Sequence, residues 1–152
     1  MLTADLKNLL QTAELIITVG NDLRSDDGLG PHIFKKCRIS NIQCPIINAG
    51  NKPENIIEEA VSKKPKKVVI IDAADFGGEA GATRIIPNEH IPDTTLSTHA
   101  FPLKIIARVI EEDTKATVYF LGVQPKNVGW GEGLSPEVKK IVDEITSTIL
   151  ER

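Results

Sequence analysis

Residues 68–71 form an uninterrupted run of four β-branched apolar side chains. Such a run is typical of a strand that is covered on both faces, because an exposed face would place a polar residue at every second position. Further strands are predicted over residues 15–19, 42–48 and 117–123, with a short edge strand over residues 82–86. Helical patterns separate these strands, and such alternation favours a parallel sheet between two helical layers. We therefore expect an α/β fold with three layers, in which a twisted, mostly parallel sheet of about five strands carries helices on both faces.

Apolar residues at helical spacing predict the helices. The first covers residues 3–13, and the next begins at Leu29 after a glycine-rich loop. Another is expected after Asn51, which has Glu three residues further on, as in a capping box. The last two begin near His99 and after Ser135, a predicted N-cap that is followed by proline. Residues 87–98 show no periodicity and predict an irregular surface excursion.

The length and composition are those of an ordinary globular protein. The 152 residues include 41% hydrophobic and 26% charged residues, and no linker or repeat divides them, so residues 1–152 are predicted to form a single domain. Eighteen basic residues against 21 acidic residues give a net charge of −3, which favours neither nucleic acid nor an anionic membrane as a partner. No apolar stretch approaches the roughly 18 residues that cross a membrane.

The cysteines and the N-terminus bear on the compartment. Cys37 and Cys44 lie seven positions apart, a spacing that matches neither a redox pair nor a zinc knuckle, so we expect buried thiols. Residues 1–12 lack the apolar core of a signal peptide. We therefore expect a cytoplasmic protein.

The loop of residues 20–30, which follows the first predicted strand, concentrates acidic residues and glycines. It contains Gly20, Asp22, Asp26, Asp27, Gly28 and Gly30. Glycines allow sharp turns and close approach, whereas crowded carboxylates repel one another unless a cation or a donor lies among them. Two interpretations follow: a binding site, or a solvated turn whose acidic side chains cap the next helix.

Two further segments carry side chains of the same chemistry. Asp72 directly follows the buried run, where a carboxylate without a partner is costly, while Asp75 is more easily solvated. His99 is predicted at a helix start, where the dipole keeps imidazole neutral, so it suits either a metal ligand or a simple cap. His32 and His90 are expected at the surface rather than as ligands.

Asp27, Asp72 and His99 are expected to meet at one edge of the sheet. Ligands of such sheets bind beyond the carboxyl ends of the strands, where the strand order reverses. Two carboxylates and one imidazole leave room in a metal site for water or substrate, and such a site polarises a carbonyl or activates water. Asp26 and Asp27 compete for the inward position, and the other one is expected to accept bonds from backbone amides. The dinucleotide, nucleophile-elbow and zincin motifs are absent.

Three segments resemble one family. Residues 20–30 are similar to the Gly-Asn-x-x-x-x-Asp-[Asp/Glu]-Gly-x-Gly pattern of the [NiFe]-hydrogenase maturation endopeptidases. Residues 71–73 resemble its second acidic position at a strand end, and residues 97–103 resemble its histidine segment. Residues 49–55 and 121–129 look most like the branch that processes the large subunit of formate-hydrogenlyase-type hydrogenases.

The resemblance implies an activity and a site. It implies an endopeptidase of the metal-dependent aspartic type that removes a C-terminal extension from a nickel-loaded large-subunit precursor. Asp27, Asp72 and His99 would form the metal-binding set, with Asp27 and Asp72 as the catalytic carboxylates. The nickel would come from the precursor, other divalent ions such as zinc or cadmium would bind in vitro, and the protein would be a monomer. The alternatives are a metal-dependent hydrolase of a small molecule and a non-catalytic, nickel-dependent assembly chaperone.

Overall fold

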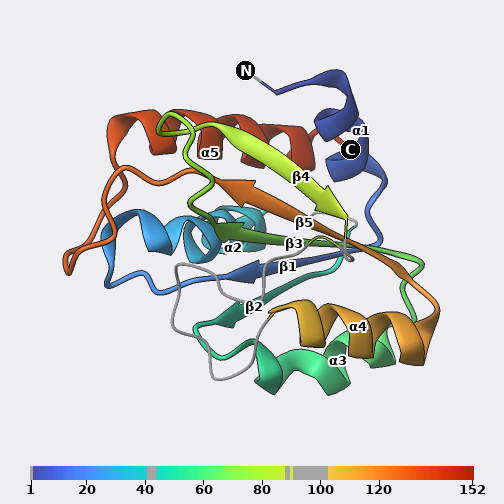
Figure 1. The fold of residues 1–152 in the computed structure, drawn as a ribbon. Coiled ribbons are helices and arrows are strands. Elements are labelled where there is room, and N and C mark those ends of the chain that lie inside the picture. Colours follow the sequence, from blue (N-terminus) through green and yellow to red (C-terminus); the bar gives the residue numbers. More distant parts are fainter. Residues whose placement is uncertain (1, 41–43, 88–89, 91–102) are drawn as a thin grey trace.

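The computed structural model describes residues 2–40, 44–87, 90 and 103–152. Within these residues the sheet consists of β1 (Leu15–Val19), β2 (Ile46–Gly50), β3 (Lys67–Ala73), β4 (Thr83–Pro87) and β5 (Thr117–Val123) (Figure 1). The spatial order is β2-β1-β3-β5-β4, and all neighbours are parallel except β4, which runs antiparallel to β5 at one edge. This arrangement confirms the predicted α/β fold with a mostly parallel sheet.

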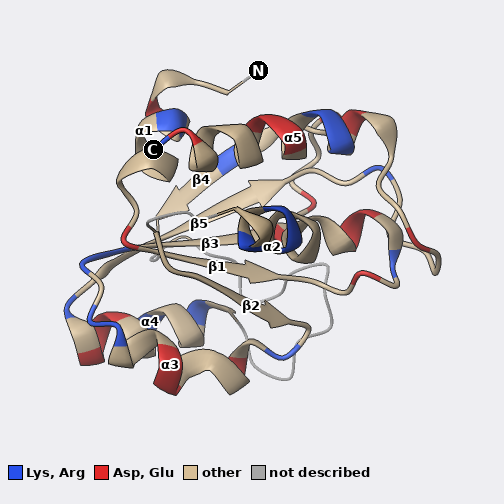
Figure 2. Cartoon of the chain, turned by 180° about the vertical axis from the view of Figure 1, so that it is seen from behind, with Lys and Arg blue, Asp and Glu red and all other residues tan. Residues whose placement is uncertain are grey.

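Helices cover both faces of the sheet (Figure 1). They are α1 (Ala4–Thr12), α2 (Leu29–Ile39), α3 (Ile57–Ser62), α4 (Leu103–Thr114) and α5 (Pro136–Leu150), with 3-10 turns η1 (Ser25–Gly28) and η2 (Pro53–Ile56). One layer contains α1, α2 and α5, and the other contains α3 and α4. Charged residues of both signs are interspersed on these helices (Figure 2). Of the described helices, none has the length and apolar content needed to cross a membrane.

The central strands β1 and β3 join the two halves of the core. Every residue of β1 is buried, and residues 68–71 of β3 are fully inaccessible to solvent. Their side chains alternate between the layers, so that Ile16 packs toward α2 and α5 while Ile17 packs toward α3 and α4. Burial of each large aliphatic side chain stabilises the fold by roughly 1.5–3 kcal/mol relative to exposure.

The strand order reverses between β1 and β3. From β1 the chain crosses to β2 on one side, and from β2 it returns to β3 on the other side of β1. The last paired residues of β1 and β3 are Thr18 and Ile71, so Asp72 lies one residue beyond them. The loop of residues 20–30, called the acidic loop below, leaves β1 at the same end. The crevice position of an open parallel sheet is therefore bordered by the loop after β1 and the end of β3.

Two predicted boundaries differ from the structure. The helix expected after Asn51 begins with η2, whose N-cap position is Lys52 and has no capping side chain, so the capping box is not formed. The second strand begins at Ile46 rather than residue 42, and residues 41–43 lie outside the described part of the chain. The expected start of α4 near His99 lies outside it too, as does nearly all of the excursion over residues 87–98.

Candidate active site

Two glycines bring the acidic loop against the end of β1. Gly20 has φ +142°, and a Cβ there would lie 2.0 Å from the carbonyl oxygen of Asp27. A Cβ on Gly30 would lie 2.4 Å from the carbonyl oxygen of Val19. Both separations are shorter than any side chain tolerates, so only glycine lets η1 and the start of α2 approach β1 this closely. The loop therefore holds Asp27 at the carboxyl end of the sheet.

The two adjacent aspartates of η1 are both buried but have different partners. Asp26 has no exposed surface, and its carboxylate accepts bonds from the amides of Lys126, Asn127 and Ser135 and from the Ser135 hydroxyl. Asp27 is 3% exposed, and its Oδ2 accepts a bond from the Asn21 amide at 3.1 Å. Both aspartates therefore accept bonds from backbone amides: Asp26 has three amide donors among residues 126–135, whereas Asp27 accepts a bond from Asn21 of its own loop.

Asp72 lies at the end of β3, next to this turn. It has no exposed surface, and its Oδ1 accepts a bond from the Ala73 amide at 2.8 Å. It pairs in register with Gly122 of β5. Because η1 contacts β3 as well as α2, the segments that carry Asp27 and Asp72 are neighbours.

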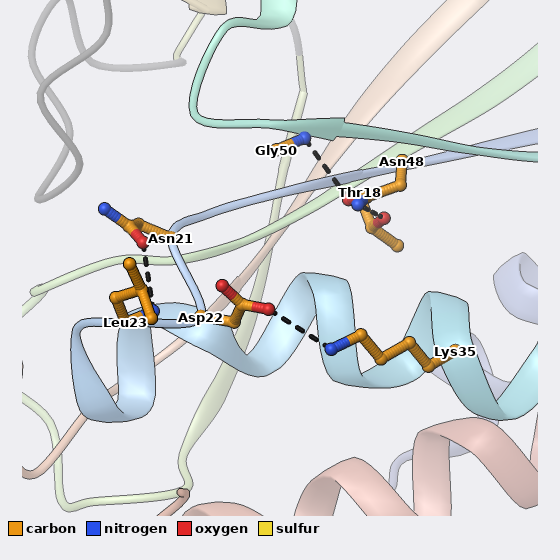
Figure 3. A network of polar contacts seen from close by, with 7 residues as sticks. All are labelled: Thr18, Asn21, Asp22, Leu23, Lys35, Asn48 and Gly50. Atoms are coloured by element: carbon orange, nitrogen blue, oxygen red, sulfur yellow. Dashed lines mark hydrogen bonds and ion pairs between the residues drawn. The ribbon is translucent and has the colours of Figure 1, made fainter. Parts of the chain in front are cut away.

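Figure 3 shows polar contacts near the carboxyl ends of β1 and β2. Asn48 of β2 accepts bonds at its Oδ1 from the Thr18 hydroxyl (3.0 Å) and from the Gly50 amide (3.2 Å). Asp22 forms an ion pair with Lys35 of α2 at 3.2 Å. These contacts join the ends of β1 and β2 to each other and the acidic loop to α2.

Two of the three histidines lie within the described part of the chain. His99 lies outside it, so its role as third ligand stays a prediction. The described residues contain no group of three His, Cys, Asp or Glu side chains placed to hold one ion.

The two described histidines lie in different environments. His90 is exposed, as expected. His32 differs from the surface position that was expected: it is half-buried beside a cavity of about 230 Å³, and its buried Nε2 has no hydrogen-bond partner. Burial, followed by the nearby charge of Lys36, lowers the pKa of His32 below its ordinary value.

Gln124 organises the loop after β3, a role that was not predicted from the sequence. Its Oε1 accepts bonds from the amides of Phe76 (2.9 Å) and Gly78 (3.1 Å), and its Nε2 donates to Asp75 (3.1 Å). Bonds from the Gly77 amide and from Gln124 lower the pKa of Asp75, which is more exposed than Asp72, as expected. The available signal was a polar residue directly after the buried strand that ends at residue 123.

Comparisons with known proteins determine the family. The HycI hydrogenase maturation protease model matches residues 32–152. The chain belongs to the hydrogenase maturation protease family. A hydrogenase 3 maturation protease of Escherichia coli is 32% identical over 134 residues, which cover 87% of this chain and 85% of the relative.

Solved structures of this protease family share the fold over almost the whole chain. The crystal structure of a [NiFe] hydrogenase maturation protease HycI from Thermococcus kodakarensis has a TM-score of 0.83 at 29% identity, covering 98% of this chain and 100% of that one. The solution structure of an endopeptidase HycI from Escherichia coli has a TM-score of 0.80 at 31% identity, covering 90% and 88%. The family resemblance and the fold expected from the sequence are both confirmed.

Proposed function

We propose that this protein is an endopeptidase that removes the C-terminal extension from the nickel-loaded large-subunit precursor of a [NiFe]-hydrogenase. The observation that carries the proposal is the pair of buried carboxylates, Asp27 and Asp72, on neighbouring segments where the strand order reverses. Such a position is the ligand crevice of an open parallel sheet. Membership of the maturation protease family makes a protein precursor the expected substrate.

The donor chemistry suits recognition of nickel that is already held by the precursor. Carboxylate oxygens of Asp27 and Asp72, with His99 as the predicted third group, provide the oxygen and nitrogen donors that divalent transition metals accept. Buried carboxylates are costly to keep charged, and a bound cation offsets part of that cost. A precursor without nickel would lack this attraction, so recognition would also act as a check on complete assembly.

The same carboxylates supply the proton transfers of peptide hydrolysis. Water attacking the scissile carbonyl must lose a proton, and the departing amine must gain one. We assign the acceptance and return of this proton to Asp27 or Asp72, while the other carboxylate orients the precursor. Substrate-bound nickel supplies Lewis-acid polarisation close to the scissile bond.

The test is incubation of the purified protein with nickel-loaded and nickel-free precursors, followed by intact-mass spectrometry. The proposal expects the loss of a C-terminal peptide from the nickel-loaded precursor alone. A nickel-dependent chaperone would bind the precursor and leave its mass unchanged. A hydrolase of small molecules would leave both precursors intact and turn over ester or phosphate substrates instead.

A further inference from the structure

We infer that Asp26 is a positioning residue, which holds residues 125–135 against the turn that carries Asp27 and thereby fixes Asp27. This segment is called the 125–135 loop below. The inference rests on the proposed function, because it concerns the geometry of the same site. Asp26 itself contacts no substrate; it acts through the loop and through the residue that follows it.

The side chain and the amide of Asp26 both bond to the 125–135 loop. Its Oδ2 accepts bonds from the amides of Lys126 (2.8 Å) and Asn127 (3.0 Å) and from the hydroxyl of Ser135 (2.8 Å). Its Oδ1 accepts a bond from the Ser135 amide at 2.7 Å, and its own amide donates to the Asn127 carbonyl at 2.9 Å. A buried carboxylate satisfied by four donors holds both ends of the loop at one point.

The residues before Asp26 fasten the middle of the same loop. The Ser25 amide donates to the Gly131 carbonyl (2.7 Å), the Ser25 hydroxyl to the Gly129 carbonyl (2.8 Å), and the Gly131 amide to the Leu23 carbonyl (2.9 Å). Ser25 has φ +51°, a left-handed conformation that a non-glycine residue keeps only where its surroundings enforce it. The acidic loop and the 125–135 loop are therefore bonded to each other at several points next to Asp27.

The four bonds that Asp26 accepts from the 125–135 loop are called the clasp below. These four bonds need two acceptor oxygens, which a carboxylate provides. Asparagine has the same shape as aspartate but only one acceptor oxygen, and its NH₂ group would face N–H or O–H donors. Asp26→Asn therefore breaks the bonds on one side of the clasp with little change in volume. Ser135→Ala removes the hydroxyl donor alone and leaves the three amide donors.

Trp130 can report on the mobility of the 125–135 loop. Trp130 is the only tryptophan of the sequence, and it is 77% exposed. The guanidinium of Arg24 lies 5.2 Å from the centre of its ring, a cation–π contact between the acidic loop and the 125–135 loop. Release of the loop would free this ring, so the time-resolved fluorescence anisotropy of Trp130 measures whether the clasp is closed.

The experiment combines this anisotropy with cleavage kinetics on the nickel-loaded precursor, at a temperature where circular dichroism shows each variant folded. Asp26→Asn is expected to lower kcat by about tenfold or more and to increase the local motion of Trp130, because small misplacements of reacting groups are costly. Ser135→Ala is expected to lower kcat by about threefold, since one bond of four is lost. Ser147→Ala, at an exposed position of α5, is the control and should match the wild type.

Wild-type kcat and wild-type Trp130 anisotropy in a folded Asp26→Asn variant would overturn the inference. Should Asp26→Asn fail to fold, an unchanged kcat and anisotropy in Ser135→Ala would overturn it as well. A purely structural role would lower stability but leave the kcat of the folded fraction at the wild-type value. If the wild type cleaves no precursor, the proposed function fails, and the anisotropy of the two variants still decides whether Asp26 holds the loop.

Discussion

Asp26 and Ser135, which lie 109 residues apart in the sequence, are joined by two hydrogen bonds, from the serine amide to Oδ1 (2.7 Å) and from its hydroxyl to Oδ2 (2.8 Å). Ser135 occupies the N-cap position of α5, as predicted, but its hydroxyl makes no capping bond to that helix. The hydroxyl donates to the buried carboxylate of Asp26 instead. The start of the last helix is thereby tied to the turn that carries Asp27.

Replacement of Ser135 by alanine tests the strength of this tie. Ser135→Ala should lower the free energy of unfolding by about 1–2 kcal/mol, because a partly buried, charge-assisted bond is lost while the amide bond remains. Urea unfolding at neutral pH measures the change. The exposed Ser147→Ala should stay within about 0.5 kcal/mol of the wild type. Equal stability of all three proteins would contradict the prediction.

Gly30 offers a second test of how the acidic loop is built. Gly30→Ala should destabilise the fold by more than about 3 kcal/mol, because the added Cβ would collide with the backbone of Val19. Gly50→Ala is the control: its φ of +59° is unfavourable, but nothing lies within 4 Å of the added Cβ. Its cost should be about 1–2 kcal/mol. Thermal melts that rank Gly50→Ala as the more damaging substitution would exclude this explanation of the close approach.

His32 should make stability depend on pH. Its pKa in the folded protein is lowered from 6.5, first by burial and then by Lys36, so below that value the unfolded chain binds more protons. The stability contributed by neutral His32 is therefore present above pH 6.5 and is lost as pH falls through the folded pKa. Urea unfolding at about pH 7.5 and about pH 5.5 should show a smaller pH dependence for His32→Asn than for the wild type. His90→Asn, at an exposed position, is the control, and equal pH dependence in all three proteins would refute the prediction.

The cysteines should be unreactive in the native protein. Burial, with a smaller effect of Cys44, raises the pKa of Cys37 to about 11, and both thiols are buried. At about pH 8 a disulfide reagent such as DTNB should label neither cysteine until the chain is denatured, when both react. Rapid labelling of either thiol under native conditions would contradict the prediction and show that the layer of α1, α2 and α5 opens locally.

The sequence was sufficient to predict the mostly parallel sheet and the position of the loop after β1 next to the end of β3. The uninterrupted apolar run of residues 68–71 identified β3, and the short, largely apolar run of residues 15–19 identified β1, because strands covered on both faces carry no regular polar alternation. The partners of Asp26 were not predictable, since Lys126 and Asn127 donate through backbone amides that nearly every residue type has. The prediction of a capping box after Asn51 was wrong because the helix begins with the 3-10 turn η2. Local sequence patterns do not determine whether the first turn of a helix is 3-10 or α.

The most direct test of the central claim is the intact mass of a nickel-loaded precursor after incubation with the wild type, Asp27→Asn or Asp72→Asn. Both substitutions keep the side-chain shape and remove the charge. We predict that the wild type releases the C-terminal extension, whereas both variants, folded by circular dichroism, leave the precursor at full mass. Cleavage at the wild-type rate by either variant would contradict the assignment of these two buried carboxylates.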